Sequence, residues 1–197
     1  MDKAIYSTTQ AAKILNVTAR TVQLWADSGL LLVGKTPGGH RRIKGESIQK
    51  LLHSMAVAPK SVTEQPPQKS VLIVDDDPEF QKLLCKKIEK WQFGLTILTA
   101  NDGYQGLIKV GRLQPDIILT DLKMPHMNGL HMIAALKSSS ELKHSKIVVI
   151  TGLSPYSMDS KWLKDSDVPI LEKPVPFDTL KHIIKDALDK NEALSSI

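Results

Sequence analysis

From residue 70 onward, short apolar runs alternate with stretches in which apolar residues recur at helical spacing. The runs predict strands at 70–75, 95–99, 116–120, 146–151 and 168–171. The periodic stretches predict helices at about 78–91, 103–113, 129–138, 155–164 and 177–190. Strands that are apolar along their whole length are typical of a parallel sheet covered on both faces. The pattern therefore predicts an α/β fold, a doubly wound five-stranded parallel sheet of the flavodoxin type.

The helix predicted at 78–91 shows this spacing most clearly. Its apolar side consists of Phe80, Leu83, Leu84, Ile88 and Trp91. Asp77 can cap the first turn, and Pro78 suits the first helical position, where no N–H is needed. The only cysteine, Cys85, falls on the same side and is expected to be a buried structural thiol. One cysteine allows no intramolecular disulfide, which fits a reducing compartment.

The first 57 residues follow a different pattern. Ser7 and Gln10 have the spacing of a capping box before a helix at about 8–15, and Thr18 can cap a second helix at about 19–28. The second helix has an apolar side and ends at a glycine, with Val22, Leu24, Trp25 and Gly29 at these positions. A strand at 30–33, a Pro-Gly-Gly tip, a returning strand and a helix at about 45–55 complete the segment. Two capped helices followed by a hairpin predict a winged helix-turn-helix.

Residues 58–69 separate the two patterns. This stretch contains three prolines and no aromatic residue, which is typical of an exposed, extended linker. We therefore expect a first domain at 1–57, a linker at 58–69, a second domain at 70–191 and a short tail at 192–197.

The charge is divided unevenly between the two domains. The first 69 residues contain ten lysine and arginine residues against four aspartate and glutamate residues, whereas the remainder contains sixteen against seventeen. A basic first third favours a nucleic-acid-binding module, although an ordinary charged surface would give the same count. No signal peptide and no apolar run of membrane-spanning length is found in the sequence, so a cytoplasmic protein without a membrane partner is expected.

Candidate DNA contacts lie at the start of the second helix and on the hairpin. Residues near the start of a helix in the major groove reach base edges, and basic residues on a wing can neutralise phosphates. Trp25 has two interpretations, core packing or an indole contact to a phosphate. The candidates are Thr18, Arg20, Thr21, Gln23, Trp25, His40, Arg41 and Arg42. The alternative for the whole segment is a small helical protein-binding module.

The second domain places reactive side chains at the ends of its predicted strands. Asp75 and Asp76 follow one strand, Asp121 another, and Thr151 and Lys173 two more. Because carboxyl ends of parallel strands share one edge, these groups are expected to meet there. Converging carboxylates repel unless a cation balances them, and Mg²⁺ prefers such oxygen ligands. In the simpler alternative, the acids only cap a helix and the others are ordinary loop residues.

The N-terminal segment resembles the winged helix-turn-helix of the MerR family, in its short excisionase-like or BldC-like form. The residues that carry the resemblance are Ser7-Thr-Thr-Gln-Ala-Ala12, Thr21-Val-Gln-Leu-Trp25, Gly29-Leu30 and Pro37-Gly-Gly-His-Arg-Arg42. It covers about residues 5–54 and implies binding to double-stranded DNA. MerR regulators usually continue into a long dimerising helix, and no heptad run follows here.

The second domain resembles the CheY-like receiver domain of two-component response regulators over about residues 70–191. The motifs lie at 71–78, 100–103, 115–129, 148–152 and 172–174. The resemblance implies that Asp121 is the phosphoacceptor, and that Asp75, Asp76, Asp121 and the backbone carbonyl of Lys123 bind Mg²⁺. It also implies that Thr151 and Lys173 contact the phosphoryl group and that Lys173–Pro174 is a cis peptide. Ile170 stands where that family usually has tyrosine or phenylalanine.

Together the two resemblances predict a DNA-binding response regulator that is not an enzyme. A sensor histidine kinase or phosphotransfer protein would phosphorylate Asp121, and a homodimer or oligomer would form on DNA. One alternative is a receiver-shaped oligomerisation module that is never phosphorylated. Another is a haloacid-dehalogenase-like phosphatase, but Asp75-Asp-Asp77-Pro-Glu79 lacks the Thr or Val that follows the acids in that family.

Overall fold

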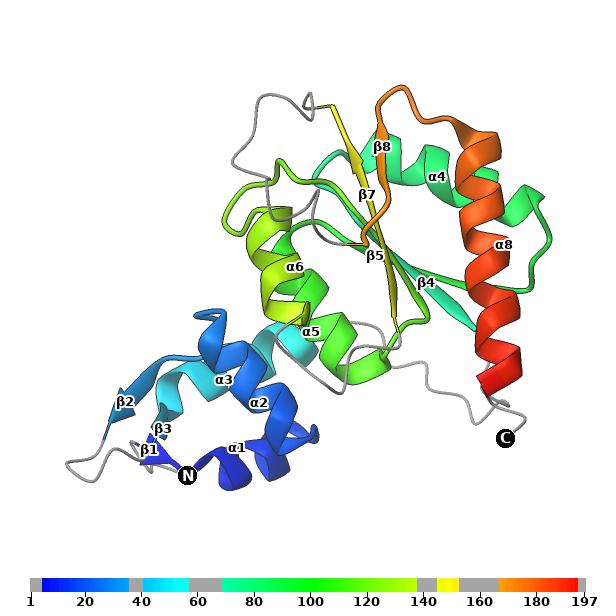
Figure 1. The fold of residues 1–197 in the computed structure, drawn as a ribbon. Helices are drawn as coiled ribbons and strands as arrows, with labels where there is room; N and C mark the ends of the chain where they lie inside the picture. Colours follow the sequence, from blue (N-terminus) through cyan, green and yellow to red (C-terminus); the bar gives the residue numbers. More distant parts are fainter. Residues whose placement is uncertain (1–4, 36–40, 57–68, 138–144, 153–166, 195–197) are drawn as a thin grey trace. The chain divides into compact units, whose positions relative to one another are not determined.

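The structure, a computed structural model, describes residues 5–35, 41–56, 69–137, 145–152 and 167–194 (Figure 1). The chain folds as two compact units, divided mainly between residues 66 and 67. Among the described helices, none combines the length and the apolar character needed to cross a membrane.

The N-terminal unit contains three helices and a small antiparallel sheet among its described residues. The helices are α1 (Thr8–Leu15), α2 (Ala19–Asp27) and α3 (Gly45–Ala56), and the strands are β1 (Ile5–Tyr6), β2 (Val33–Lys35) and β3 (Arg41–Lys44), in the order β1-β3-β2. The predicted capping box is confirmed, because Ser7 and Gln10 exchange side-chain to backbone bonds of 3.0 and 3.2 Å. Thr18 caps α2 as predicted.

The strand predicted at 30–33 is wrong in its position. The N–H of Leu31 donates to the carbonyl of Trp25, so the chain is still leaving α2 at this point. Leu31 is buried in the core, and the strand begins only at Val33. The pairing of Ile5–Tyr6 with Ile43–Lys44 was missed, because two residues are too few to show an alternating pattern.

The C-terminal unit is built on a five-stranded parallel sheet, as predicted. The strand order is β5-β4-β6-β7-β8. The strands are β4 (Ser70–Val74), β5 (Thr96–Ala100), β6 (Ile117–Thr120), β7 (Lys146–Thr151) and β8 (Ile170–Glu172), and the helices are α4 (Pro78–Lys90), α5 (Gly103–Leu113), α6 (Gly129–Lys137) and α8 (Phe177–Leu194). The helix predicted at 155–164 lies outside the described residues.

Helices cover both faces of this sheet, with α4 and α8 on one side and α5 and α6 on the other (Figure 1). Alternate strand residues face the two layers, so that Ile73, Leu119 and Ile150 join Leu84 and Ile184 in one core. The strands therefore need apolar side chains on both faces, which is why they read as continuous apolar runs. This arrangement leaves the carboxyl edge of the sheet for the reactive side chains.

Several details differ from the sequence predictions. Leu83 and Leu52 are exposed, although both were assigned to apolar helix faces, and Cys85 is half-buried rather than buried. The last strand begins at Ile170 instead of residue 168, because Pro169 has no N–H for the ladder and contributes only its carbonyl, to Val149. Helix α8 runs to Leu194, beyond the predicted end at residue 190.

Candidate functional site

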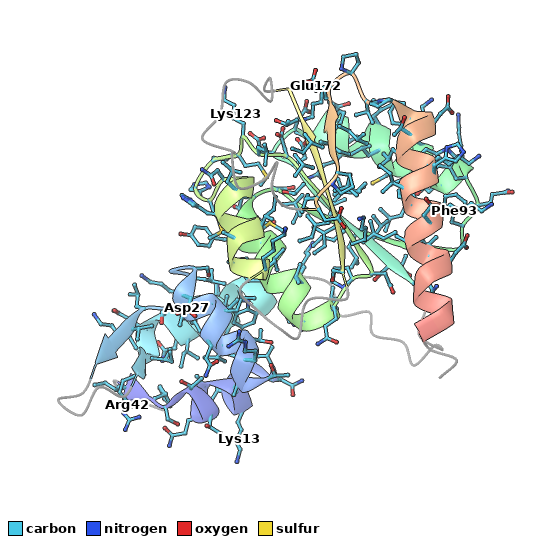
Figure 2. The ribbon with its side chains drawn as sticks, in the orientation of Figure 1. Lys13, Asp27, Arg42, Phe93, Lys123 and Glu172 are labelled. Atoms are coloured by element: carbon cyan, nitrogen blue, oxygen red, sulfur yellow. The ribbon has the colours of Figure 1, made fainter. Side chains whose placement is uncertain are left out.

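Three carboxylates meet at the carboxyl edge of the C-terminal sheet. Asp75 and Asp76 follow β4, and Asp121 follows the neighbouring strand β6. One ligand oxygen from each lies within 4.8 Å of the others, with Asp75 and Asp121 buried and Asp76 exposed. Figure 2 labels two residues near these strand ends, Lys123, two positions after Asp121, and Glu172, the last residue of β8, and both lie in the upper part of the view.

The sheet fixes the backbone of both buried acids. The Asp121 N–H donates to the Val74 carbonyl at 2.9 Å, and the Asp75 N–H donates to the Ala100 carbonyl at 3.0 Å. These bonds extend the parallel ladders by one residue past each strand. The two carboxylates therefore project from rigid strand ends rather than from loops.

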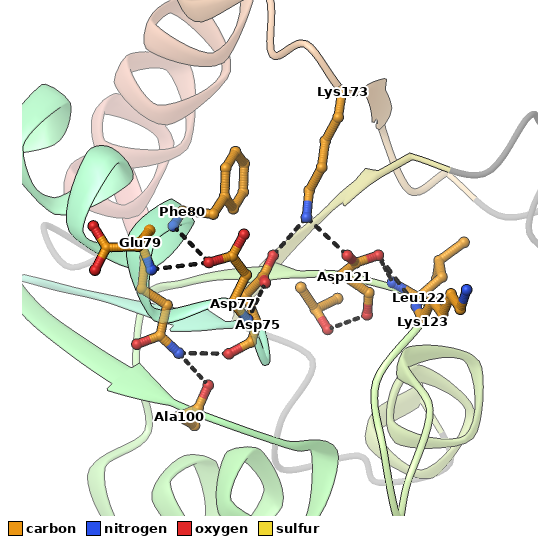
Figure 3. A network of polar contacts seen from close by, with 11 residues as sticks. Asp75, Asp77, Glu79, Phe80, Ala100, Asp121, Leu122, Lys123 and Lys173 are labelled. Carbon is orange, nitrogen blue, oxygen red and sulfur yellow. Dashed lines mark hydrogen bonds and ion pairs between the residues drawn. The ribbon is translucent and has the colours of Figure 1, made fainter.

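Backbone amides hold one oxygen of each buried carboxylate. Asp121 Oδ1 accepts from the N–H groups of Leu122 and Lys123 at 2.5 and 3.1 Å. Asp75 Oδ1 accepts from the Asp77 N–H at 2.9 Å. Since Oδ1 of each acid is engaged by the chain, the two Oδ2 atoms remain to face the centre of the site (Figure 3).

Lys173 joins the two buried acids. Its Nζ donates to Oδ2 of Asp75 and to Oδ2 of Asp121, both at 2.8 Å (Figure 3). Its own backbone N–H donates to the Thr151 carbonyl at 2.8 Å, which ties the ends of β7 and β8 together. The Lys173–Pro174 peptide is cis, as the family resemblance implied. Thr151 is buried at the end of β7.

Burial and the neighbouring charges together shift the pKa values of Asp75 and Lys173. Burial raises the pKa of Asp75 above its usual range, and this outweighs the hydrogen bonds from Lys173 and Asp77 that lower it. Burial alone would lower the pKa of Lys173, but its bonds to Asp121 and Asp75 and their negative charges raise it. The lysine is therefore firmly protonated, and the cost of the buried Asp75 charge is only partly offset.

The donor set fits a Mg²⁺ ion. All of its side-chain donors are carboxylate oxygens, and the exposed Asp76 leaves room for the water ligands that this ion retains. The partly offset charge of Asp75 is a further reason to expect a cation beside it. Asp75, Asp76 and Asp121 would hold the ion, with the Lys123 carbonyl as the further ligand implied by the resemblance.

Gln81 belongs to the site and was missed in the sequence. Its side-chain amide is buried and donates to the carbonyls of Asp75 and Ala100, at 2.6 and 2.9 Å. These hydrogen bonds link α4 to the carboxyl ends of β4 and β5, next to Asp75. A signal was present, because Gln81 shares the buried face of α4 with Leu84 and Ile88, and a polar residue there needs a buried partner.

The candidate DNA contacts of the N-terminal unit divide into accessible and buried residues. Thr18 is exposed, while Arg20, Gln23 and Arg42 are partly exposed, and Arg20 donates to Gln23 at 3.3 Å. Thr21 and Trp25 are buried, with 4% and 0% of their surface exposed. We therefore correct the assignment of Thr21 as a direct DNA contact, and of the two interpretations of Trp25 its burial agrees with core packing and not with a phosphate contact. The backbone of Arg41 lies in β3, and His40 lies outside the described residues.

Comparison with known proteins decides the family. The family described as response regulator receiver domain matches residues 71–185, which is more than half of the chain. The chain belongs to this family. A second family, described as helix-turn-helix domain, matches residues 5–56. The C-terminal unit is therefore a receiver and the N-terminal unit a helix-turn-helix domain, and this combination indicates a regulator.

Individual relatives match the receiver. The transcriptional regulatory protein GlrR of Escherichia coli is 30% identical over 121 residues, covering 61% of this chain and 26% of that protein. Hybrid signal transduction histidine kinase D of Dictyostelium discoideum is 31% identical over 104 residues, covering 53% of this chain and 6% of the kinase. The chain thus spans about a quarter of the length of the first relative and much less of the second.

Solved receiver structures show the same fold. The signal receiver domain of a DNA-binding response regulator from Colwellia psychrerythraea aligns with a TM-score of 0.55 at 24% identity, covering 61% of this chain and 98% of that one. At this identity the match supports the parallel-sheet architecture of the receiver.

Proposed function

We propose that the protein is a DNA-binding response regulator whose receiver accepts a phosphoryl group on Asp121. The observation that carries the proposal is the Lys173 ammonium, which bridges Asp75 and Asp121 at 2.8 Å with the Asp76 carboxylate beside them. An acid, a fixed cation and a set of metal ligands at one sheet edge are the parts that phosphoryl transfer to a carboxylate requires.

A phosphohistidine of a sensor kinase or phosphotransfer protein would be the donor. A carboxylate oxygen of Asp121 attacks phosphorus, the P–N bond breaks, and the imidazole leaves and takes a proton. A bound Mg²⁺ supplies charge neutralisation for the phosphoryl oxygens. Lys173 donates an N–H to one of these oxygens, and the Thr151 hydroxyl, at the end of the adjacent strand, would donate to another.

The helix-turn-helix unit would bind DNA, with α2 in the major groove. Thr18, Arg20 and Gln23 are accessible at or near the start of this helix, and the partly exposed Arg42 on β3 would contact the phosphates of the DNA. The basic excess of the first 69 residues supports the same assignment. A MerR-like, excisionase-like subtype belongs to this proposal, since its wing motif spans His40, Arg41 and Arg42.

The phosphorylation half is tested by incubating the full chain with acetyl phosphate and Mg²⁺. Wild type should gain one base-labile, acid-stable phosphate, and Asp121→Ala should gain none. Asp186→Asn is the matched control, because Asp186 is an exposed acid on α8 and should leave labelling unchanged. Equal labelling of wild type and Asp121→Ala would refute the assignment of the phosphoacceptor.

The second part of the proposal is that phosphorylation of Asp121 changes DNA binding. Its test needs a DNA site, which can be selected from a random-sequence duplex library with the full chain. Binding isotherms on the selected site, with and without a beryllofluoride mimic of the phosphoryl group, should differ in wild type and coincide in Asp121→Ala. Light scattering under the same conditions would show whether a dimer or oligomer forms. A change of oligomeric state without any labelling of Asp121 would favour the alternative, an oligomerisation module that is not phosphorylated.

A further inference from the structure

The ammonium of Lys173 has a third neighbour besides the two carboxylates. Its Nζ lies 4.0 Å from the centroid of the Phe80 ring (Figure 3). A cation over the face of an aromatic ring at this distance is attracted by the negative face of the ring. The sequence placed Phe80 among the apolar residues of α4, and the half-buried ring does pack against the core. The same ring therefore also contacts the Lys173 ammonium, the positive charge of the acid site.

The position of the ring is tied to the acids by a short stretch of chain. Asp77 follows Asp76 directly and caps α4, and its Oδ1 accepts from the N–H groups of Glu79 and Phe80 at 2.9 and 3.2 Å. The cap fixes the first turn of α4 and with it the direction in which the Phe80 side chain leaves the helix. The ring is thus held relative to Asp75 and Asp76 by local structure.

We infer that Phe80 is a positioning residue for Lys173, an inference that rests on the proposed phosphorylation of Asp121. Two N–H groups of the ammonium are used by Asp75 and Asp121. The attraction of the ring does not require a particular N–H, so the ammonium can turn from a carboxylate to a phosphoryl oxygen without losing it. The ring also shields one side of the ammonium from water, which strengthens the bonds that Lys173 makes.

A leucine side chain would fill most of this space without attracting the charge. Phe80→Leu should therefore keep the packing against the core and loosen Lys173. Labelling of Asp121 by radiolabelled acetyl phosphate with Mg²⁺ should slow by about two- to tenfold, the range that a partly exposed cation–ring contact allows. Phe80→Tyr keeps the ring face and should label at the wild-type rate.

A double-mutant cycle shows whether the effect passes through Lys173. In a Lys173→Met background the ring has no cation to hold, so Phe80→Leu should cause no further slowing. Urea unfolding of each full-length variant records its stability. The inference is overturned if the two substitutions slow labelling independently, if Phe80→Tyr is as slow as Phe80→Leu, or if Phe80→Leu labels like wild type.

Nuclear magnetic resonance gives a readout that does not depend on phosphate transfer. In wild type and Phe80→Tyr, the ε-methylene protons of Lys173 should be shifted upfield by the ring current, and this shift should vanish in Phe80→Leu. Unshifted protons in wild type would remove the contact itself and with it the inference. Absence of label on wild-type Asp121 would instead refute the proposed function, so the two failures are distinguishable.

Discussion

A Cβ atom on Gly129 would lie 2.0 Å from the backbone carbonyl oxygen of Asp121. The N–H of Gly129 donates to the Leu122 carbonyl at 3.1 Å, so the loop that leaves β6 folds back onto the strand end before α6 begins. The contact is with backbone, which cannot rotate away as a side chain could. A glycine is therefore required at this place if Asp121 is to keep its position.

Gly129→Ala is expected to destabilise the receiver by about 2 kcal/mol or more, because the new methyl group must displace the strand end. The higher helix propensity of alanine offsets only part of this loss of stability. Urea unfolding gives the loss of stability, and labelling of Asp121 should slow as well. Gly152→Ala is the control, because a Cβ there meets nothing within 4 Å. A Gly129→Ala protein as stable as this control would contradict the prediction.

Arg42 provides a test of the proposed DNA surface, because its side chain is partly exposed on β3. If it contacts a phosphate, Arg42→Gln should weaken binding to all DNA sequences by a similar factor. The slope of log affinity against log salt should fall by about one. Arg112→Gln removes the same charge from an exposed position on α5 and should leave the slope unchanged. An unaltered slope in Arg42→Gln would exclude the contact.

Thr18 has a structural role that can be separated from any DNA contact. Its Oγ1 accepts from the Thr21 N–H at 3.1 Å and lies 3.0 Å from the Thr21 hydroxyl oxygen. Thr18→Ala should lower the stability of the helix-turn-helix unit by about 1 kcal/mol, because α2 loses its cap. Hydrogen exchange of the α2 amides measures this locally. Thr18→Ser keeps the hydroxyl and should exchange like wild type, and equally fast exchange in both variants would argue against the cap.

The arrangement of the sheet and of the acid site could be predicted because periodicity and topology act together. Parallel strands place their carboxyl ends on one edge, so the positions of Asp75, Asp121 and Lys173 follow from the strand pattern alone. The direction of individual side chains does not follow from it. Leu83 and Leu84 are adjacent apolar residues, and only the packing of α4 decides that Leu84 is buried and Leu83 exposed.

In the N-terminal unit, too, the burial of a side chain depends on tertiary packing. A polar residue near the start of α2 suggests a DNA contact, but the Thr21 side chain is buried, and its hydroxyl oxygen lies 3.0 Å from that of the exposed cap residue Thr18. In the receiver, the contact between Phe80 and Lys173 joins residues that are far apart in the chain, and no local sequence pattern predicts it. Contacts across the sheet edge are tertiary, so they appear only once the strands are assembled.

Lys109 lies on α5, outside the acid site, and its burial predicts how the stability of the protein depends on pH. Burial lowers its pKa below the ordinary value of 10.5, and its ammonium donates to the carbonyl of Thr99. Between the folded-state pKa and 10.5, the unfolded chain binds more protons than the folded one. This group therefore makes the protein more stable as pH rises through that interval, and its buried charge costs stability below it.

Lys109→Met removes this titration. The free energy of unfolding of the variant minus that of wild type should therefore decrease as pH rises from neutral to about 10, since only wild type gains stability in this interval. The loss of the bond to Thr99 shifts this difference by an amount that does not depend on pH while Lys109 stays charged. Urea unfolding at several pH values measures it. Lys86→Met is the matched control, because it removes the same charge from an exposed position on the same unit. A flat or rising difference for Lys109→Met would show that burial does not depress the pKa of Lys109.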